Sequence, residues 1–210
     1  MKTLKYLFVG ILLLNLLPVC ISQTPVKGKQ VITLQSVRKN APRELLAESK
    51  AVLTRRLERM DLRDVQISLN NSTAELIITV VDTISPATLS EILLTRGNVG
   101  FKADTLLALN QENLSDVHAD FTRPDHPALC ISFKEDKWKA LEDLTAGNMG
   151  KPVAFVVDDN VYSAPVITDK ISHGQISLTG SGFSTAEVRK LVAILSSGPV
   201  PLKFILANQK

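Results

Sequence analysis

The sequence predicts an α+β protein built from two βαββαβ-like units, with antiparallel or mixed sheets and helices on one face. Short apolar or alternating runs, typical of strands, recur between runs whose apolar residues are spaced three or four positions apart, as in helices. Capping and turn-forming residues separate these runs. The chain has 210 residues, 45% of them hydrophobic and 21% charged, a composition that supports a packed core.

Residues 1–22 are expected to be a cleaved signal peptide. A positively charged start precedes the apolar stretch 6–17, and small residues allow cleavage before Gln23. The end of this segment also loosely resembles a bacterial lipoprotein signal, which would end before Cys20 and leave that cysteine lipidated. An uncleaved anchor is a third alternative. All three export the rest of the chain, to the periplasm or, as a lipoprotein, to the outer membrane of a Gram-negative bacterium.

Residues 23–30 are polar and are expected to be a linker, and residues 31–104 are expected to form the first unit. In order, its predicted elements are a strand at 31–37, a helix at 42–60, strands at 65–69 and 74–81, a helix that starts at 85–86, and a strand at 99–102. This order is the ferredoxin-like arrangement, in which two helices cover one face of an antiparallel sheet.

The helix expected at 42–60 is amphipathic. Leu46, Leu53 and Leu57 lie on one side, which predicts that this side faces the core. The other side is charged and is interpreted as a solvated face, with a docking patch as the alternative. The residues assigned to this charged side are Arg43, Glu44, Glu48, Arg55, Arg56 and Arg59.

Residues 105–127 are expected to be a connecting loop, in which 106–109 could form a short helical turn. His118, Asp120 and His126 are residue types that bind metals. Their spacing matches no established metal site, and such residues on a loop are more often polar surface. No metal and no cofactor are therefore expected.

Residues 128–210 are expected to form the second unit. Ser184 and Glu187 predict a capping box at the start of a helix, and Gly198 suits the left-handed residue after its last turn. In order, the predicted elements are a strand at 128–133, a helix at 136–145, strands at 153–157, 161–163 and 175–179, the capped helix at 184–197 and an exit strand at 202–206.

Asp158, Asp159 and Asn160 end the strand at 153–157. Their short polar side chains tolerate a left-handed backbone and favour a hairpin turn. The two carboxylates could form a catalytic pair, but adjacent residues of a strand point to opposite faces, which favours the turn role. The sequence also contains no G-x-S-x-G elbow, P-loop, H-E-x-x-H motif or paired cysteine ligands. We therefore expect no enzymatic activity.

The stretch 150–201 resembles the signature of SecD, the accessory subunit of the bacterial Sec export machine. A buried strand ends in an acidic turn followed by Ser-Ala-Pro-Val-Ile. A Gly-rich strand, Gln-Ile-Ser-Leu-Thr-Gly, and a capped helix ending in Leu-Ser-Ser-Gly-Pro-Val-Pro follow it. SecD usually has a glycine at or beside Asn160 and Leu-Pro near Val200. The residues that carry the resemblance are Gly150, Asp158, Ser163, Ala164, Pro165, Ile167, Gly174, Ile176, Gly180, Phe183, Leu191, Leu195, Gly198 and Pro201.

The resemblance implies that residues 31–104 correspond to the base of the first periplasmic domain of SecD and residues 128–210 to its head. SecD-type proteins use the proton gradient, through their membrane part, to pull or release the translocating polypeptide. No apolar run after the leader is long enough to span a bilayer, so we expect a periplasmic module without these spans. The signature residues that could contact polypeptide are Asp158, Asn160, Tyr162, Ser163, Ala164, Pro165, Gly174 and Gly180.

Two functional hypotheses remain. The first is a non-catalytic SecD-like module that binds unfolded or extended polypeptide, or an envelope or translocon protein, in relation to protein export. Strand edges or an apolar groove would capture the polypeptide. The alternative is a structural scaffold in the cell envelope with no export role. Nucleic acid is not an expected partner, because the formal net charge is only +3, and membrane contact is expected only through a lipid anchor at Cys20.

Overall fold

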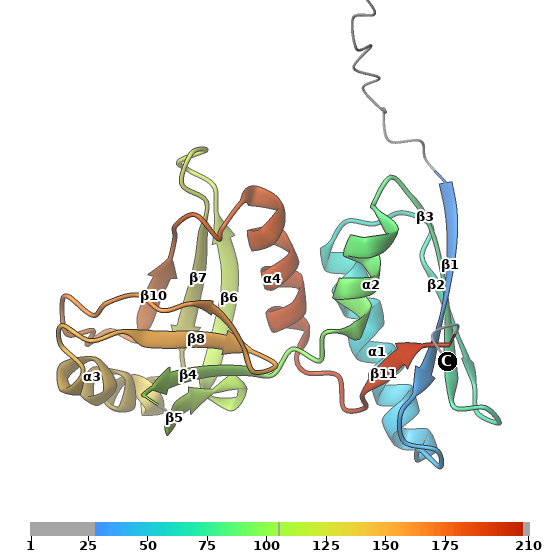
Figure 1. The fold of residues 1–210 in the computed structure, drawn as a ribbon, viewed down its shortest axis with the longest axis horizontal. Helices are drawn as coiled ribbons and strands as arrows, with labels where there is room; N and C mark the ends of the chain where they lie inside the picture. The colour runs from blue at the N-terminus through green and yellow to red at the C-terminus, as the bar shows by residue number, and fades with distance from the viewer. Residues whose placement is uncertain (1–27, 105, 208–210) are drawn as a thin grey trace, which may run out of the picture.

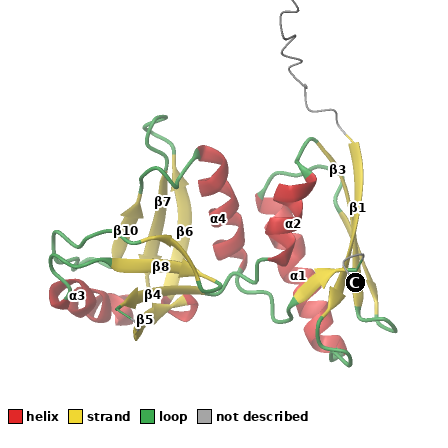
Figure 2. Cartoon of the chain, in the orientation of Figure 1, coloured by secondary structure: helices red, strands yellow, loops and turns green. Residues whose placement is uncertain are grey.

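The computed structural model describes residues 28–104 and 106–207 as an α+β protein with antiparallel sheets (Figures 1 and 2). This arrangement confirms the predicted fold class. The predicted signal peptide and the predicted lipidation of Cys20 lie outside these described residues. None of the described helices is both long enough and apolar enough to cross a membrane.

Elements from both ends of the described chain form the first unit. The strands make one antiparallel sheet in the order β11-β1-β3-β2. Both helices pack on one face of this sheet (Figure 2), where apolar side chains of helices and strands share one buried core. The elements are β1 (Gly28–Ser36), α1 (Arg43–Arg59), β2 (Gln66–Asn70), β3 (Glu75–Asp82), α2 (Pro86–Leu94) and β11 (Phe204–Leu206).

The last strand of this sheet differs from the prediction. Residues 99–102, expected to complete the first unit, belong to β4 (Val99–Ala103), which pairs with β8 (Val153–Val157) of the second unit. Residues 204–206, expected to be the exit strand of the second unit, instead form β11 and pair with β1. A strand sequence shows which side chains face a core, but it does not specify the sheet that the strand joins. The second unit is therefore inserted between α2 and β11.

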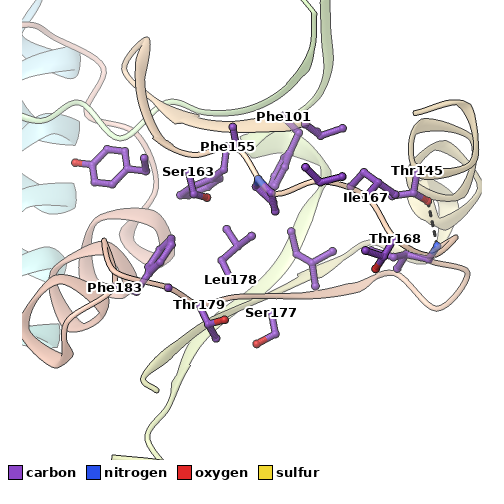
Figure 3. A pocket seen from close by; sticks show the side chains of 18 of the residues that line it. Phe101, Thr145, Phe155, Ser163, Ile167, Thr168, Ser177, Leu178, Thr179 and Phe183 are labelled. Atoms are coloured by element: carbon purple, nitrogen blue, oxygen red, sulfur yellow. Dashed lines mark hydrogen bonds between the residues drawn. The ribbon is translucent and has the colours of Figure 1, made fainter. Parts of the chain in front are cut away.

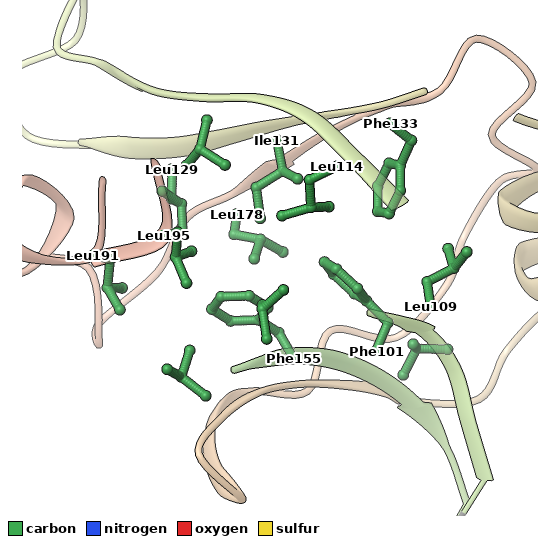
Figure 4. Close-up of a cluster of buried hydrophobic side chains, with 14 of the residues drawn as sticks. Phe101, Leu109, Leu114, Leu129, Ile131, Phe133, Phe155, Leu178, Leu191 and Leu195 are labelled. Carbon is green, nitrogen blue, oxygen red and sulfur yellow. The ribbon is translucent and has the colours of Figure 1, made fainter. Parts of the chain in front are cut away.

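The second unit contains two sheets, in the orders β5-β4-β8-β9 and β10-β7-β6. Phe101 and Phe155 from the first sheet point toward Leu129 and Ile131 of the second (Figure 4), and all four side chains are buried. The remaining elements of this unit are β5 (Leu106–Asn110), η1 (Gln111–Asn113), β6 (Leu114–Asp120), β7 (Ala128–Phe133), η2 (Glu135–Lys137), α3 (Trp138–Gly147), β9 (Asn160–Ser163), β10 (Gln175–Leu178) and α4 (Thr185–Ser197).

The segment 105–127, expected to be a loop, contains two strands. The run 106–109 belongs to β5 rather than to a helical turn, and β6 pairs with β7. Irregularities interrupt the register of both pairs, so the period-two pattern by which a strand is recognised is broken. Residues 28–30 of the expected linker likewise belong to β1, where they pair with β3.

Capping side chains mark the starts of α2 and α4. The predicted start of α2 at 85–86 is confirmed, because the hydroxyl of Ser85 caps the helix by accepting a hydrogen bond from the backbone N–H of Thr88. At the start of α4 the hydroxyl of Ser184 accepts from the backbone N–H of Glu187 at 3.2 Å. Gly198, at φ 82°, follows the last turn, as predicted. The carboxylate of Glu187 does not close the predicted capping box and pairs instead with Lys190 at 2.8 Å.

Arg56 is an exception to the expected solvated side of α1. Its side chain is fully buried between the two units, and every nitrogen of the guanidinium donates a hydrogen bond. Burial lowers its pKa to about 10, against the raising effect of the Asp158 carboxylate, so the group is charged at neutral pH. The acceptors are the carbonyl oxygens of Ile92, Thr95, Arg96 and Gly198 and the hydroxyl of Ser197.

The chain passes between the units through residues 95–98 and 198–203, which we call the crossing segments. They are hydrogen-bonded to each other, because the amide of Val200 donates to the carbonyl of Arg96 at 2.8 Å and the Arg96 side chain donates to the carbonyl of Val200 at 3.2 Å. Helices α1 and α4 lie against each other beside these segments (Figure 1). The connection between the units is therefore a bonded structure and not a pair of free linkers.

Candidate functional site

A pocket of about 620 Å³ lies in the second unit, where the edge strands of its two sheets face each other. One wall is formed by residues 162–169, which include the end of β9, and the other by residues 175–183, which include β10. Figure 3 shows Ser163 on the first wall above Leu178 on the second. We call this site the β9–β10 pocket.

The floor of the β9–β10 pocket is apolar and rich in aromatic side chains. Phe101 and Phe155 lie in it with their ring centroids 5.5 Å apart. Tyr162 meets Phe155 edge-on at 6.2 Å, and Phe183 closes one end (Figure 3). Three of the seven phenylalanines of the chain therefore line one cavity. A cavity of this size and lining suits apolar side chains of a ligand.

Five of the eight signature residues line this pocket: Tyr162, Ser163, Ala164, Pro165 and Gly180. The hydroxyl oxygen of Ser163 is buried and has no hydrogen-bond partner in the part of the chain that the structure describes. Buried hydroxyl groups are normally paired, so a bound molecule could supply the missing partner. Burial raises the pKa of Tyr162, so its phenol is neutral at physiological pH.

Asp158 lies outside the pocket and binds the first crossing segment. Its carboxylate accepts from the backbone N–H groups of Arg96 (2.6 Å), Gly97 (3.1 Å) and Asn98 (2.9 Å). The residue itself has a left-handed backbone, with φ 48°. Asp158 therefore ends β8, as its place in the turn predicts, and also connects this turn to the segment that leaves α2.

The neighbours of Asp158 have separate roles. Asp159, at φ 67°, is exposed and pairs with Lys102 at 3.1 Å, so the two carboxylates bind different groups and do not form a catalytic pair. The exposed side-chain amide of Asn160 donates a long hydrogen bond, of 3.5 Å, to the carbonyl oxygen of Asp158. Asn160 therefore supports the turn and does not line the pocket.

Gly174 also lies outside the pocket, and its role is steric. It has a left-handed backbone (φ 65°), and a Cβ atom there would lie 1.9 Å from Nε1 of Trp138. The indole needs this space, because Nε1 donates to the carbonyl of Phe133 at 3.0 Å. The glycine allows Trp138, the first residue of α3, to pack against the start of β10.

The residues considered as metal ligands do not meet in one site. His118, on β6, pairs with Asp116 at 2.7 Å, and Asp120 accepts from the backbone N–H of Thr122. Within residues 28–104 and 106–207, no group of three or more histidine, cysteine, aspartate or glutamate side chains is placed to hold a metal ion.

Sequence reasoning missed the floor of the pocket and the buried arginine. Phe101 and Phe155 are 54 positions apart and meet only because β4 pairs with β8. The available signal was compositional, since the chain is only 5% aromatic and each phenylalanine in an apolar run is informative. Arg56 follows Leu53 by three positions, so helical spacing placed it on the core side of α1.

The comparisons with known proteins agree with this geometry. The model of the family described as "SecDF, P1 head subdomain" matches residues 90–202, more than half of the chain. Protein translocase subunit SecD from Calditerrivibrio nitroreducens is 41% identical over 87 residues, which make up 40% of this chain and 16% of that protein. The SecD subunit from Dictyoglomus turgidum is 27% identical over 157 residues, which make up 73% of this chain and 39% of that protein. The chain thus spans well under half of these relatives.

Two solved structures have a similar fold. A crystal structure of SecDF in a super-membrane-facing form matches with a TM-score of 0.69 and 21% identity, over 88% of this chain and 30% of that one. A structure described as a membrane component SecDF that enhances protein export matches with a TM-score of 0.65 and 20% identity, over 86% of this chain and 99% of that one. The range of the family match contains every residue that lines the β9–β10 pocket. The chain belongs to the SecDF P1 head subdomain family.

Proposed function

We propose that this chain is an exported, non-catalytic module that binds an extended stretch of polypeptide in the β9–β10 pocket, in relation to protein export. The relatives are translocase subunits by name, and one similar structure is described as a component that enhances protein export. This chain covers only part of those proteins, so a role of this chain in protein export is part of the proposal.

The observation that carries the proposal is the pairing of an apolar floor with two strand edges. Polypeptide in an extended conformation offers side chains on alternate sides and a row of backbone donors and acceptors. The floor around Phe101 and Phe155 suits the side chains, and β9 and β10 are both terminal strands of their sheets. A folded protein surface or a small polar molecule would use only one of these two features.

The polar groups near the pocket support binding rather than catalysis. The carboxylate of Asp158 is occupied by three backbone N–H groups. Ser163 lacks the base that a nucleophilic serine requires, because no histidine or lysine lies among the described residues that line the pocket. The site thus contains an apolar surface and an unpaired hydroxyl, which bind and orient a ligand.

The division of the chain into two units forms part of the same proposal. Residues 31–104 were expected to be a base-type unit and residues 128–210 a head-type unit. The strand pairings favour a revised division, in which the head-type unit extends from β4 to α4 and the base-type unit includes β11. The family match at 90–202 supports this revision, since it covers the inserted elements. An envelope or translocon protein is the further partner that we propose, for the base-type unit.

Export through the N-terminal segment remains a prediction, as does lipidation of Cys20. The mass of the mature N-terminus, measured on protein from the native host, tests both. A chain that begins at Gln23 would support the periplasmic form, and a diacylated or triacylated Cys20 would support the lipoprotein.

Amide hydrogen exchange tests the polypeptide-binding proposal. The purified exported chain would be titrated with a capped decapeptide that alternates leucine and glutamine. We expect slower exchange in β10 and in residues 160–168 when the peptide is bound, with no change in β2. Unchanged exchange throughout the second unit at saturating peptide would refute the proposal. Protection of a helix face by a purified envelope protein, without peptide protection, would favour the scaffold alternative.

Two matched variants locate the binding surface. Val166, on the pocket wall, and Val31, on the sheet of the first unit, are both valines that are 57% exposed. Val166→Gln should weaken binding of the leucine–glutamine peptide by roughly three- to tenfold, because a large apolar contact is lost. Val31→Gln should leave binding unchanged. Both variants should keep the thermal unfolding midpoint, because neither side chain belongs to a core.

A further inference from the structure

We infer that the bound polypeptide joins β10 as an additional strand, and that the segment it presents is apolar and free of acidic residues. This inference rests on the proposed function, because it specifies how the β9–β10 pocket holds its ligand. It is carried by the hydrogen-bond register of β10, by the contrast between the two walls and by the charges of the lining.

The register shows which backbone groups of β10 are free. The amide of Phe133 donates to the carbonyl of Gly174 at 2.8 Å, and the next pairs along the strands are Gln175 with Ser132 and Ile176 with Ile131. Bonded and non-bonded pairs alternate in an antiparallel ladder. Residues 176 and 178 therefore bond to β7, whereas residues 175 and 177 direct their N–H and C=O groups to the outer edge.

The side chains agree with this register. Cys130 and Ser177 are opposite each other, and their sulfur and oxygen atoms are 3.9 Å apart. Side chains approach closely in the non-bonded pairs of a ladder. Ser177 thus presents its own N–H and C=O at the outer edge of β10, which lines the pocket and pairs with no other strand of the described residues.

The edge of β10 is open to strand addition, whereas the opposite wall is protected. Natural edges are blocked by proline, charged side chains or bulges. β10 (Gln175–Leu178) contains no proline and no charged residue, and its pairing with β7 has no bulge. The β9 wall contains Pro165, whose carbonyl is already taken by the amide of Val153, and its pairing with β8 is irregular between Phe155 and Val156. We therefore expect the backbone of the peptide to pair with β10 and its side chains to contact the β9 wall.

The charges of the lining select against acidic segments. Among the described residues that line the pocket, there is no lysine, arginine or histidine, and Asp169 is the one carboxylate. An acidic side chain would lose its hydration beside the phenylalanine floor and gain no cationic partner. Leucine-like side chains would replace water there at no such penalty.

Ser163 supplies a polar contact that an incoming strand can use. Its hydroxyl is buried in the wall opposite β10 and lacks a partner among the described residues. A hydroxyl can donate to a backbone carbonyl or accept from an amide. In an added strand, every second residue bonds to β10. The residues between them direct their N–H and C=O groups toward the wall that contains Ser163.

Backbone N-methylation of the peptide tests strand addition without changing the protein. Two versions of the leucine–glutamine decapeptide would be made, one methylated at the leucine nitrogens and one at the glutamine nitrogens. In a strand bonded to one edge, only one of these sets donates to β10. We expect one version to bind at least about tenfold more weakly than the other, since several hydrogen bonds are lost. Equal weakening of the two would overturn strand addition.

A substitution on β10 tests the same contact from the protein. Ser177→Pro removes an edge N–H but no bond to β7, so peptide binding should fall about tenfold. Ser177→Ala keeps the N–H and should bind normally. Normal peptide binding by Ser177→Pro would overturn the inference. If Ser177→Pro alters the circular dichroism spectrum or the unfolding midpoint, the methylated peptides decide alone.

The acidic counterpart of the peptide tests the chemical class. A leucine–glutamine decapeptide whose two central leucines are replaced by glutamate should bind at least about tenfold more weakly at neutral pH than one in which glutamine replaces the same two leucines, because these positions face the floor. Equal binding would overturn the claim that acidic segments are excluded. If Val166→Gln weakens peptide binding but the two methylated peptides bind equally well, strand addition is refuted and the proposed function stands. Absence of binding by every peptide would remove the proposed function itself.

Discussion

Arg56 and Asp158 hold the same crossing segment, one through its carbonyl groups and the other through its amide groups. The Arg56 guanidinium donates to the carbonyls of residues 95 and 96, and the Asp158 carboxylate accepts from the N–H groups of residues 96–98. Arg56 belongs to the first unit and Asp158 to the second. This segment is therefore fixed from both units, which gives Asp158 a structural reason to belong to the signature although it lies outside the pocket.

Replacement of Arg56 tests the importance of this anchor. Arg56→Ala would remove the guanidinium donor from four buried or partly buried carbonyl groups, of which the carbonyl of Arg96 keeps the amide of Val200 as a donor. We expect the free energy of unfolding to fall by about 3–5 kcal/mol, because a buried charged donor and five hydrogen bonds are lost together. Urea unfolding followed by circular dichroism measures it. Arg59→Ala is the control, because Arg59 makes an exposed bond to Ser196 and should shift the midpoint little. Equal midpoints for the two variants would contradict this role of Arg56.

Asp158→Asn separates the charge of Asp158 from its backbone conformation. Asparagine has the same size and tolerates a left-handed backbone, but it is uncharged, and its NH2 group cannot replace the second carboxylate oxygen as an acceptor for the three N–H groups. Charged acceptors bind about twice as strongly as neutral ones, so we expect a loss of about 1–3 kcal/mol in the free energy of unfolding. Asp159→Asn, at the exposed neighbour, should leave the urea midpoint unchanged. A similar response of both variants would mean that the carboxylate of Asp158 does not hold the crossing segment.

The sequence predicted the fold where local chemistry decides it. The caps at Ser85 and Ser184, the left-handed glycine at 198 and the turn at Asp158 depend on residues close to each other in the chain. The partner of β4 was mispredicted because pairing is decided between strands far apart. The exchange of β4 and β11 shows this, since each has the pattern of a strand, and neither pattern specifies its sheet.

The candidate site was predicted in part for the same reason. Tyr162, Ser163 and Pro165 lie in one continuous stretch and were identified together, and the structure places them on one wall. The floor combines β4 with β8, so no local pattern connects Phe101 to Phe155. Arg56 was misassigned because its charge was given more weight than its position, although its spacing from Leu53 placed it on the buried side of α1.

Lys190 provides a pH-dependent link between the units. Its side chain is 7% exposed and bonds to Glu187 of α4 and Glu91 of α2. Burial lowers the pKa of Lys190, but the bonds to Glu187 and Glu91 outweigh burial and raise it above its usual value. Because the pKa is higher in the folded chain, the stabilisation is complete below the unfolded value of about 10.4 and is lost as the pH rises through the folded value.

Lys190→Met tests this link. At about pH 8 the variant should be less stable than the parent by about 1–2 kcal/mol, because the charged hydrogen bonds are lost. This difference should shrink as the pH rises above the ordinary lysine value of about 10.4, because Lys190 of the parent then loses its proton. Thermal unfolding of both proteins across this range measures the difference. A gap that stays constant up to the highest pH would contradict the assignment of the pKa shift to this lysine.

Gly174→Ala tests the steric role of the signature glycine, with the single tryptophan of the chain as reporter. The new Cβ would lie 1.9 Å from Nε1 of Trp138, so the indole must move and release the carbonyl of Phe133. The strained backbone and the lost packing should together reduce the free energy of unfolding by about 2–4 kcal/mol, and tryptophan emission should shift to longer wavelength as the ring becomes more exposed.

Gly147→Ala is the matched control, since a Cβ there meets no atom within 4 Å. Because Gly147 is the last residue of α3, alanine should stabilise the chain slightly, by about 0.5 kcal/mol. Unchanged emission in Gly174→Ala, with stability equal to that of Gly147→Ala, would show that Trp138 does not require this glycine.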